Sequence, residues 1–559
     1  MWSRRAFLFF QRIRSAAQFA AADARRVSTT GPSISFSGSK SYGQFNYGSA
    51  WRKHPWDFML GIMLSGPVAI YLSFSRNPVS AQDVSEADLV TENDEAQAYV
   101  TGLRRIEDGS VISNSHTSRW RIFTDHGRDL FLKGKLDEAE KYFQSAVHEA
   151  KEGFGTRDPH VASSYNNLAE LYRVSKAFEK AEPLYLEAIS ILEESFGADD
   201  IRVGAALHNL GQFYLAQRKL EQARTCYERA LKIKGRVLGH GHTDYANTMY
   251  HLGTVLHLLG KEKDSMALIQ ESISILEENG LGESTTCVRR MRYLSQILLS
   301  SNRLAEAESL QRKILHILEL SKGWDSLETV LAAERLALTL QANGSLLEAQ
   351  ELLERCLVAR KEILPPAHVQ VAANMLHLAR IAMLNSKQLW KMKSSKAKSE
   401  LEKAKLLIDN SIRMAKAVLD HPTKNRNSLQ SNNAHTDIEK DQHVALIILL
   451  QSLDAVGLLE VTKHEILETK FPEDIQEACE FPSEAELALR ECVSIFKEPH
   501  TRRMLLNASD VTAEYLSCLK HLTSLLGEST DESKLRVLQE LKYELQHIEA
   551  ELTPRRQRN

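Results

Sequence analysis

Apolar residues recur along the middle of this chain with the spacing of amphipathic helices. In one segment Leu184, Ala188 and Ile191 fall on a single face of a helix with a 3.6-residue period. Over longer distances, leucines recur at intervals of 42 residues: Leu168, Leu210, Leu252, Leu294, Leu336 and Leu378. No single globular domain requires such a register, so the pattern predicts an array of one repeated helical unit.

Small residues mark two further positions of each unit. The residue after each leucine is Ala, Gly or Ser, as in Ala169 and Gly211, and a second small residue follows twelve positions later, as in Ala181 and Ala223. Small side chains at this spacing allow two helices to approach closely. We therefore predict that each unit is a pair of antiparallel helices, with short turns inside the pair and Gly- or Pro-containing loops between pairs.

The units resemble the tetratricopeptide repeat, and their length of 42 residues resembles its kinesin-light-chain subtype. The segment HVASSYNNLAELYRVSKAFEKAEPLYLEAISILEESFG (160–197) carries the resemblance most fully, and HNLGQFY (208–214) and YHLGTVL (250–256) repeat its centre. The resemblance implies an all-α fold: a right-handed α-solenoid of about seven to eight helix-turn-helix repeats. On composition, we expect a presequence and one hydrophobic span to precede it.

Composition shifts and loops divide the chain into eight predicted segments. They are a targeting presequence (1–30), a disordered linker (31–57), a transmembrane helix (58–75), an acidic mobile linker (76–118), seven repeats with an insertion at 388–399 (119–420), a polar linker (421–442), a divergent repeat-like pair (443–498) and C-terminal capping helices (499–559).

The first 30 residues are rich in arginine and poor in acids. They contain Arg4, Arg5, Arg12, Arg14, Arg25 and Arg26 against the single acid Asp23, and their apolar residues give the stretch an amphipathic character. This composition is typical of an organellar presequence. We favour the mitochondrion over the chloroplast because early arginines on an amphipathic segment suit import driven by a membrane potential. A disordered basic tail is the alternative.

Residues 58–75 contain no charged side chain. As a helix they would span ~27 Å, close to the ~30 Å hydrocarbon core of a bilayer. Arg52 and Lys53 precede them, whereas 77–103 contain acids and no Lys or Arg. Under the positive-inside rule, this asymmetry predicts a mitochondrial inner-membrane anchor with the repeats in the intermembrane space. The alternatives are a signal cleaved after Ala81, a buried or interfacial helix, a chloroplast location, and the cytosol.

Charge and motifs exclude several classes of function. The formal net charge is −3, which gives no basic field for nucleic acid. No phosphate loop, dinucleotide fingerprint or zinc-protease motif occurs, so we predict neither enzymatic activity, nor a cofactor, nor a small-molecule substrate. We interpret His240 and His242 as loop residues rather than metal ligands. We interpret the six cysteines, Cys226, Cys287, Cys356, Cys479, Cys492 and Cys518, as core-filling residues.

The resemblance implies a binding groove along the first helices of the pairs. Its candidate residues are Arg128, Asn166, Asn167, Glu170, Arg173, His208, Asn209, Gln212, Asn247, Tyr250, His251, Arg289 and Arg292. Family members use asparagine at the positions of Asn167 and Asn209 to hold a peptide backbone, since an amide both donates and accepts. The arginines suit acidic groups. The alternative for any one of these residues is an ordinary solvated side chain.

Three hypotheses for function follow. The preferred one is a non-enzymatic scaffold at the mitochondrial inner membrane, whose groove binds peptide segments of clients during assembly or maintenance of a membrane complex. The second is a cytosolic cargo adaptor of the kinesin-light-chain kind, which is disfavoured because residues 77–120 lack a sustained heptad. A soluble repeat protein released by signal cleavage, and an enzyme, are the remaining alternatives.

Overall fold

The chain is helical throughout the part described by the structure, a computed structural model covering residues 114–365, 368–392, 396–420, 432–468, 483–498, 509–526 and 532–556. These residues form 18 helices and no strand. The predicted presequence (1–30), linker (31–57) and transmembrane helix (58–75) lie outside the described residues, as does most of the acidic linker (76–118).

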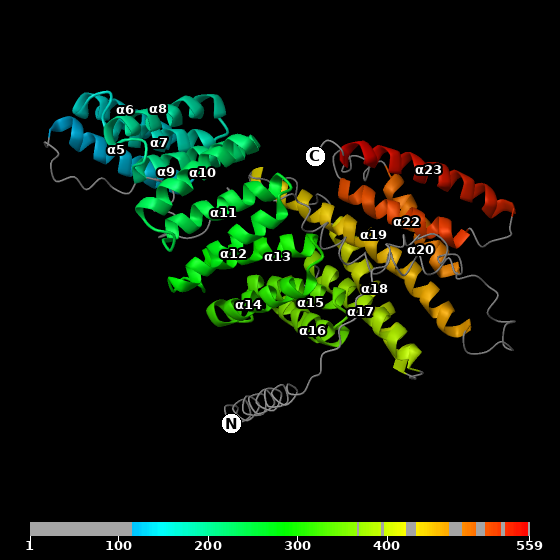
Figure 1. The fold of residues 1–559 in the computed structure, drawn as a ribbon. Helices are drawn as coiled ribbons and strands as arrows, with labels where there is room; N and C mark the ends of the chain where they lie inside the picture. The colour runs from blue at the N-terminus through cyan, green and yellow to red at the C-terminus, as the bar shows by residue number, and fades with distance from the viewer. Residues whose placement is uncertain are drawn as a thin grey trace, which may run out of the picture. The chain divides into compact units, whose positions relative to one another are not determined.

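In chain order the helices are α5 (Ser115–Leu132), α6 (Leu136–Phe154), α7 (Pro159–Val174), α8 (Phe178–Phe196), α9 (Ile201–Ala216), α10 (Leu220–Val237), α11 (Thr243–Leu258), α12 (Glu262–Glu278), α13 (Thr285–Ser300), α14 (Leu304–Lys322), α15 (Leu327–Ala342), α16 (Leu346–Ile363), α17 (Val369–Lys391), α18 (Lys396–Asp420), α19 (Asn432–Glu468), α20 (Ser483–Lys497), α22 (Ser509–Leu526) and α23 (Glu532–Arg556) (Figure 1).

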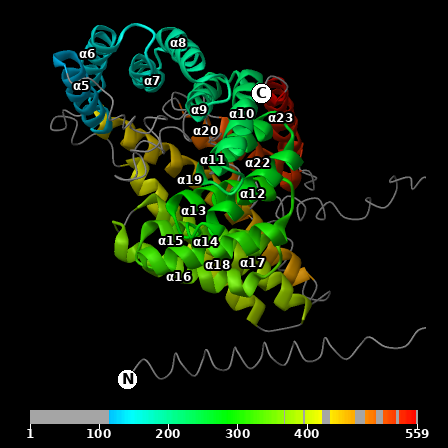
Figure 2. The same cartoon turned by 60° about the vertical axis from the view of Figure 1, so that its left-hand side comes forward.

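The helices from α5 to α18 form seven consecutive pairs. Each odd-numbered helix packs against the even-numbered helix that follows it, and each pair packs against the next one (Figures 1 and 2). The predicted all-α array of helix pairs is thus confirmed. The buried apolar side chains form consecutive hydrophobic clusters along the array, as expected when each unit covers the apolar face of its neighbour.

The small residues of the repeat lie where the two helices of a pair touch. All six repeated leucines are buried, and Ala169, Ala181 and Ala223 have no exposed surface. A methyl group added at Gly211 would lie 2.8 Å from the Tyr227 ring, and one at Gly253 would lie 2.7 Å from Ile269. These contacts are shorter than van der Waals contact, so the small side chains set the distance between the helices.

Turns and caps follow the same register. The turns inside the first six pairs each contain one residue in the left-handed region, including Lys176, Arg218 and Gly260. Several first helices begin with a side-chain cap, and at α11 the ring of His242 accepts a hydrogen bond from the amide of Asp244 at 3.0 Å. His368 caps α17 in the same way. These two loop histidines therefore serve as helix caps.

Exposed ion pairs connect successive second helices of the array. They join residues 36 positions apart, as in Lys313–Glu277 at 2.7 Å, Arg312–Glu348 at 2.6 Å and Arg355–Glu319 at 3.4 Å. Their side chains are substantially exposed, so each pair contributes little, ~0–1 kcal/mol. The repeated spacing nevertheless shows that neighbouring units keep one geometry.

Helix α19 organises the C-terminal part, where it packs against α17, α18, α20 and α22. It begins at Asn432, so the helix covers half of the segment 421–442 for which we expected a polar linker. Residues 432–442 are polar but include Ala, Glu, Lys and Gln, which favour helices, and they extend a helix already held in the core by its apolar part.

One described segment, Asp441–Lys463 of α19, is long and apolar enough to cross a membrane. However, 72% of its 18-residue apolar window is buried within the protein, and Leu446, Ile448 and Leu450 belong to the C-terminal hydrophobic cluster. A core helix surrounded by other helices has the same composition as a membrane span. We interpret this segment as a core helix.

The cysteines differ in part from our expectation. Cys226, Cys287 and Cys356 are buried free thiols, in agreement with their interpretation as core residues. Cys492 of α20 and Cys518 of α22 instead form a disulfide, so that interpretation is wrong for these two. Sequence spacing could not reveal the pair, because the two residues lie on separate helices and the pairing depends on how those helices pack.

A buried ion pair between a histidine and an aspartate connects α22 to α19. The Nδ1 atom of His521 lies 2.5 Å from Oδ1 of Asp454, and the Ser517 hydroxyl donates to the other carboxylate oxygen at 3.1 Å. Burial alone would lower the pKa of His521, but the charge of Asp454 and its hydrogen bond outweigh burial and raise this pKa above 6.5. The folded state therefore favours the charged form of this histidine.

We expect the stabilisation from this pair to be complete below pH 6.5 and to be lost as the pH rises through the raised pKa of His521. Hydrogen exchange of α22 should therefore accelerate on alkalinisation by more than the intrinsic chemical rate. In a His521→Gln variant the protection of α22 should be lower and should lose this pH dependence. Equal pH profiles in both proteins would contradict the assignment.

Candidate functional site

The thirteen predicted groove residues lie on α5, α7, α9, α11 and α13, the first helices of five consecutive pairs. Nine of them are buried: Asn166, Asn167, Glu170, Arg173, His208, Asn209, Asn247, Tyr250 and His251. The remaining four, Arg128, Gln212, Arg289 and Arg292, are partly exposed. We call these thirteen side chains the polar seam and its four partly exposed members the rim.

An ionic network occupies the α7 end of the seam. The Arg173 guanidinium donates to Oε1 of Glu170 at 2.9 and 2.5 Å, and the Tyr185 hydroxyl donates to Oε2 at 2.6 Å. Burial would lower the pKa of Arg173, but the adjacent Glu170 carboxylate raises it above its ordinary value. Burial, with Glu170 adding to it, raises the pKa of Tyr185. All three groups are paired inside the protein, which identifies a structural function for Glu170 and Arg173.

The asparagines of the seam differ sharply in their hydrogen bonding. The Nδ2 atom of Asn209 on α9 donates to Oδ1 of Asn166 on α7 at 3.0 Å, which connects two neighbouring units. Asn167 is 3% exposed, and among the described residues neither its Oδ1 nor its Nδ2 has a hydrogen-bond partner. A buried amide left unpaired costs ~1–3 kcal/mol. Asn167 is therefore a group with unused capacity to donate and to accept.

Two histidines form an aromatic cluster farther along the seam. The rings of His208 and His251 lie 5.1 Å apart between centroids, and Tyr227 of α10 stacks on His251 at 5.8 Å. Burial lowers the pKa of His251 to about 3 and holds the pKa of His208 well below 6.5. Both rings are therefore neutral at physiological pH, which suits packing and hydrogen bonding such as the 3.1 Å contact of His208 with Thr248.

Arginines dominate the α13 end of the seam. Arg292 forms a 3.5 Å ion pair with Glu328. The neighbouring Arg290, which our sequence reasoning missed, is 1% exposed and donates to Oδ1 of Asn247 at 3.3 Å and to the carbonyl oxygens of Ala246 and Ser272. One signal could have identified it: in the 42-residue register, the equivalent residues one unit either side of Arg290 are Thr and Ala.

No catalytic arrangement is apparent in the described part of the chain. The residues described there contain no group of three or more His, Cys, Asp or Glu side chains placed to hold a metal ion.

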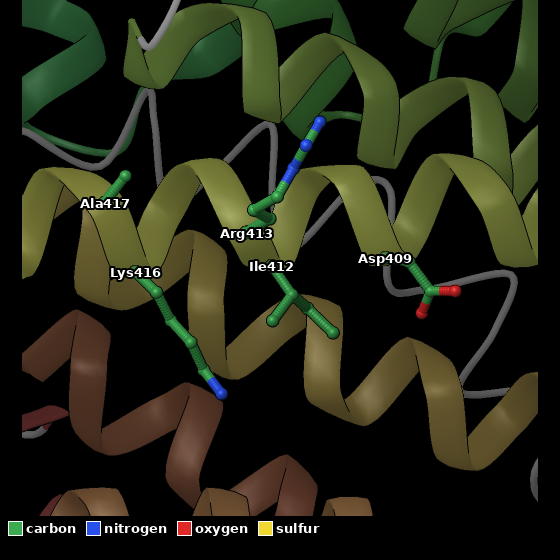
Figure 3. A pocket seen from close by; sticks show the side chains of 5 residues that line it. All are labelled: Asp409, Ile412, Arg413, Lys416 and Ala417. Carbon is green, nitrogen blue, oxygen red and sulfur yellow. The ribbon is translucent and has the colours of Figure 1, made fainter.

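A hollow of about 450 Å³ lies beside α18, lined by Asp409, Ile412, Arg413, Lys416 and Ala417. In Figure 3 the side chains of Arg413 and Lys416 point away from each other, and Lys416 pairs with Glu491 at 2.6 Å. Its polar groups therefore do not converge on a common ligand.

Comparison with known proteins identifies the repeats. Tetratricopeptide repeat family models match residues 121–194, 202–278 and 329–370. No curated protein sequence matches the chain. Similar solved structures include kinesin-light-chain TPR-like repeats from Podosopora anserina, with 20% identity, 36% of this chain and 96% of that chain covered, and a TM-score of 0.33.

Two further similar structures cover more of this chain. The apo form of RapI is 13% identical over 68% of this chain and 98% of its own, with a TM-score of 0.41. The apo form of the quorum sensor NprR from B. thuringiensis is 11% identical over 76% and 98%, with a TM-score of 0.36. The family models confirm the prediction of tetratricopeptide repeats over the residues that they match.

Proposed function

We propose that this chain, which is a tetratricopeptide repeat protein, is a non-enzymatic scaffold whose polar seam binds peptide segments of client proteins. The observation that carries the proposal is the Asn167 side chain, an amide buried in the seam with both of its polar atoms unpaired among the described residues. Such an amide suits the backbone of an extended peptide, which offers a donor and an acceptor at every residue.

Binding would recover the cost of the unpaired amide. Because Asn167 is 3% exposed, a client reaches it only after neighbouring side chains in the seam move apart. The partly exposed rim supplies the first contacts: Gln212 can accept or donate, and Arg128, Arg289 and Arg292 favour acidic side chains or a terminal carboxylate. The buried members of the seam, such as Glu170 and Arg173, hold the first helices in position for this contact.

We further propose that residues 58–75 tether the scaffold to the mitochondrial inner membrane, with the repeats in the intermembrane space. The support is the arginine-rich N-terminal segment, the uncharged stretch that follows it, and the acidic composition of residues 77–103. Clients in this position would be subunits or assembly intermediates of a membrane complex. An assembly scaffold requires recognition of exposed peptide segments and no chemistry of its own.

Replacing Asn167 with alanine is expected to weaken capture of a client peptide about 5- to 30-fold, equivalent to ~1–2 kcal/mol for a hydrogen bond that forms only in the complex. The melting temperature should stay the same or rise slightly, since the free protein loses no hydrogen bond. The clients would first be identified by mass spectrometry of material captured with the full chain from gently solubilised mitochondria. Affinity would then be measured by titration of the strongest client segment.

Two matched variants control this experiment. Asn209→Ala removes the bond to Asn166 and should lower stability as well as affinity. Asn374→Ala on α17 removes another buried amide whose two polar atoms are unpaired, at a different position of the repeat, and should leave capture unchanged. If Asn167→Ala binds clients as tightly as the native chain, the seam is not the binding site. Recovery of kinesin heavy chains and cytosolic cargo would instead support the adaptor hypothesis.

A further inference from the structure

The C-terminal helices contain a covalent connection whose function differs from that of the seam. Cys492 of α20 and Cys518 of α22 are joined as a disulfide, and their Cα atoms lie 6.6 Å apart, within the range that a disulfide spans. Both residues have no exposed surface. The bond closes a loop between residues 26 positions apart. It therefore constrains the position of α22, which packs on α19 as well as on α20.

We propose that Cys492–Cys518 is a permanent structural disulfide that fastens α22 to α20, and that the C-terminal part of this chain therefore folds where thiols become oxidised. The pairing is specific to this place in the array. Cys356 occupies the same second-helix position, seven residues after a buried alanine, and is a buried free thiol 3.7 Å from the carbonyl oxygen of Val330. A cysteine at this second-helix position is therefore not sufficient for a disulfide, and the bond at Cys492 depends on Cys518 of α22.

Other contacts align the two helices in the register that the bond requires. The rings of Phe496 and Tyr515 stack with centroids 3.7 Å apart and planes 2° from parallel. The Tyr515 hydroxyl and the Lys497 ammonium both bond to Glu544 of α23, at 2.5 and 2.8 Å. In the folded chain these interactions hold α20 and α22 in the register that places the two cysteines within bonding distance.

The oxidation needs an electron acceptor, for which we name a protein disulfide of the thiol–disulfide exchange class. A thiolate of this chain attacks that disulfide and forms a mixed disulfide while one acceptor sulfur leaves as a thiol. The second cysteine then attacks the mixed bond and releases the other acceptor sulfur. Two thiols of this chain lose two protons and two electrons, and the acceptor disulfide becomes two thiols. Because both sulfur atoms are fully buried in the folded chain, the exchange precedes the docking of α22.

This inference bears on compartment independently of the proposed seam. Thiols of cytosolic proteins are kept reduced, and stable disulfides are rare there. A completed Cys492–Cys518 bond therefore argues against the cytosolic adaptor and in favour of an array that faces an oxidising compartment. The thiol state can be measured without knowing any client, so a failure here is distinguishable from a failure of the Asn167 experiment.

The test is a thiol count on the full chain expressed in its own cells. Cells are quenched in acid, which stops thiol exchange, and the denatured protein is labelled with maleimide–polyethylene glycol before or after reduction. All six cysteines follow residue 225, so cleavage of an N-terminal segment leaves the count unchanged. We expect four adducts without reduction and six after it, because two of the six thiols are in the bond.

Matched variants assign the bond. Cys492→Ser should give five adducts with and without reduction, whereas Cys356→Ser should give three before reduction and five after it. Limited proteolysis should release α22 and α23 faster in Cys492→Ser than in Cys356→Ser. Six adducts from the unreduced native chain would overturn the proposal whatever the variants do, and so would an unchanged difference between reduced and unreduced Cys492→Ser.

Discussion

Replacing Glu334 with glutamine is expected to lower the free energy of unfolding by about 3–5 kcal/mol, because it leaves a buried guanidinium without its counter-charge. The Arg360 side chain is 1% exposed and donates to both carboxylate oxygens of Glu334, at 2.7 and 2.6 Å. Urea unfolding of the native and variant chains, followed by far-ultraviolet circular dichroism, would measure the effect. Unfolding should begin in the units around α15 and α16, since repeat arrays lose stability locally.

An exposed ion pair provides the control. Glu348→Gln removes one of the two carboxylates that pair with Arg312, Glu308 being the other, and we expect a loss below ~1 kcal/mol because the side chains of Arg312 and Glu348 are exposed. The stability of the two variants should also depend differently on acid pH. Burial would raise the pKa of Glu334, but Arg360 lowers this pKa below 4.5. The stabilisation of the native chain by the Glu334–Arg360 pair is therefore complete above pH 4.5, and it is lost as the pH falls through the lowered pKa of Glu334. Equal destabilisation by both variants would contradict the importance of burial.

Replacing Ala181 with phenylalanine is expected to destabilise the array by about 1–3 kcal/mol through overpacking. Ala181 has no exposed surface and occupies the small-residue position of α8 that recurs as Ala223 and Ala307. A ring at this position forces α7 and α8 apart, and the neighbouring units lose part of their contact. The melting temperature and the protease sensitivity of the N-terminal units would measure this effect.

Leu186→Phe adds a ring to the same helix at a site that is 49% exposed, and it should leave the melting temperature nearly unchanged. This control separates overpacking from a general effect of aromatic side chains on α8. If Ala181→Phe melts at the native temperature, the helix–helix contact is not set by the 42-residue register, and the alignment of units proposed for this chain needs revision.

The predictable part of the fold depended on repetition. A leucine followed by a small residue, with a second small residue twelve positions on, recurs often enough to define both helices of a pair, and the structure places Leu210, Gly211 and Ala223 at the contact as expected. The beginning of α19 was less predictable. Its polar first turns have no apolar pattern of their own and are helical as an extension of a buried segment.

The sequence predicted the positions of the candidate-site residues on the helices but not their hydrogen bonds. The repeat register places Asn166, Asn167 and Asn209 on adjacent first helices. Asn166 and Asn209 bond to each other, whereas Asn167 has no hydrogen-bond partner among the described residues. Which amide remains unpaired depends on side-chain geometry across two units, and a sequence pattern does not contain this information. The burial of Arg290 escaped prediction for the same reason, since its partners are mostly backbone carbonyl oxygens.

The sequence by itself determined the all-helical repeat, the register of its units and the near-neutral composition, because these properties follow from local periodicity and residue type. Only the tertiary structure decided which polar side chains pair, that Glu334 and Arg360 form a buried ion pair, and that Cys492 meets Cys518. The physical reason is distance along the chain: periodicity reports the face of one helix, whereas pairing depends on how faces from separate helices meet.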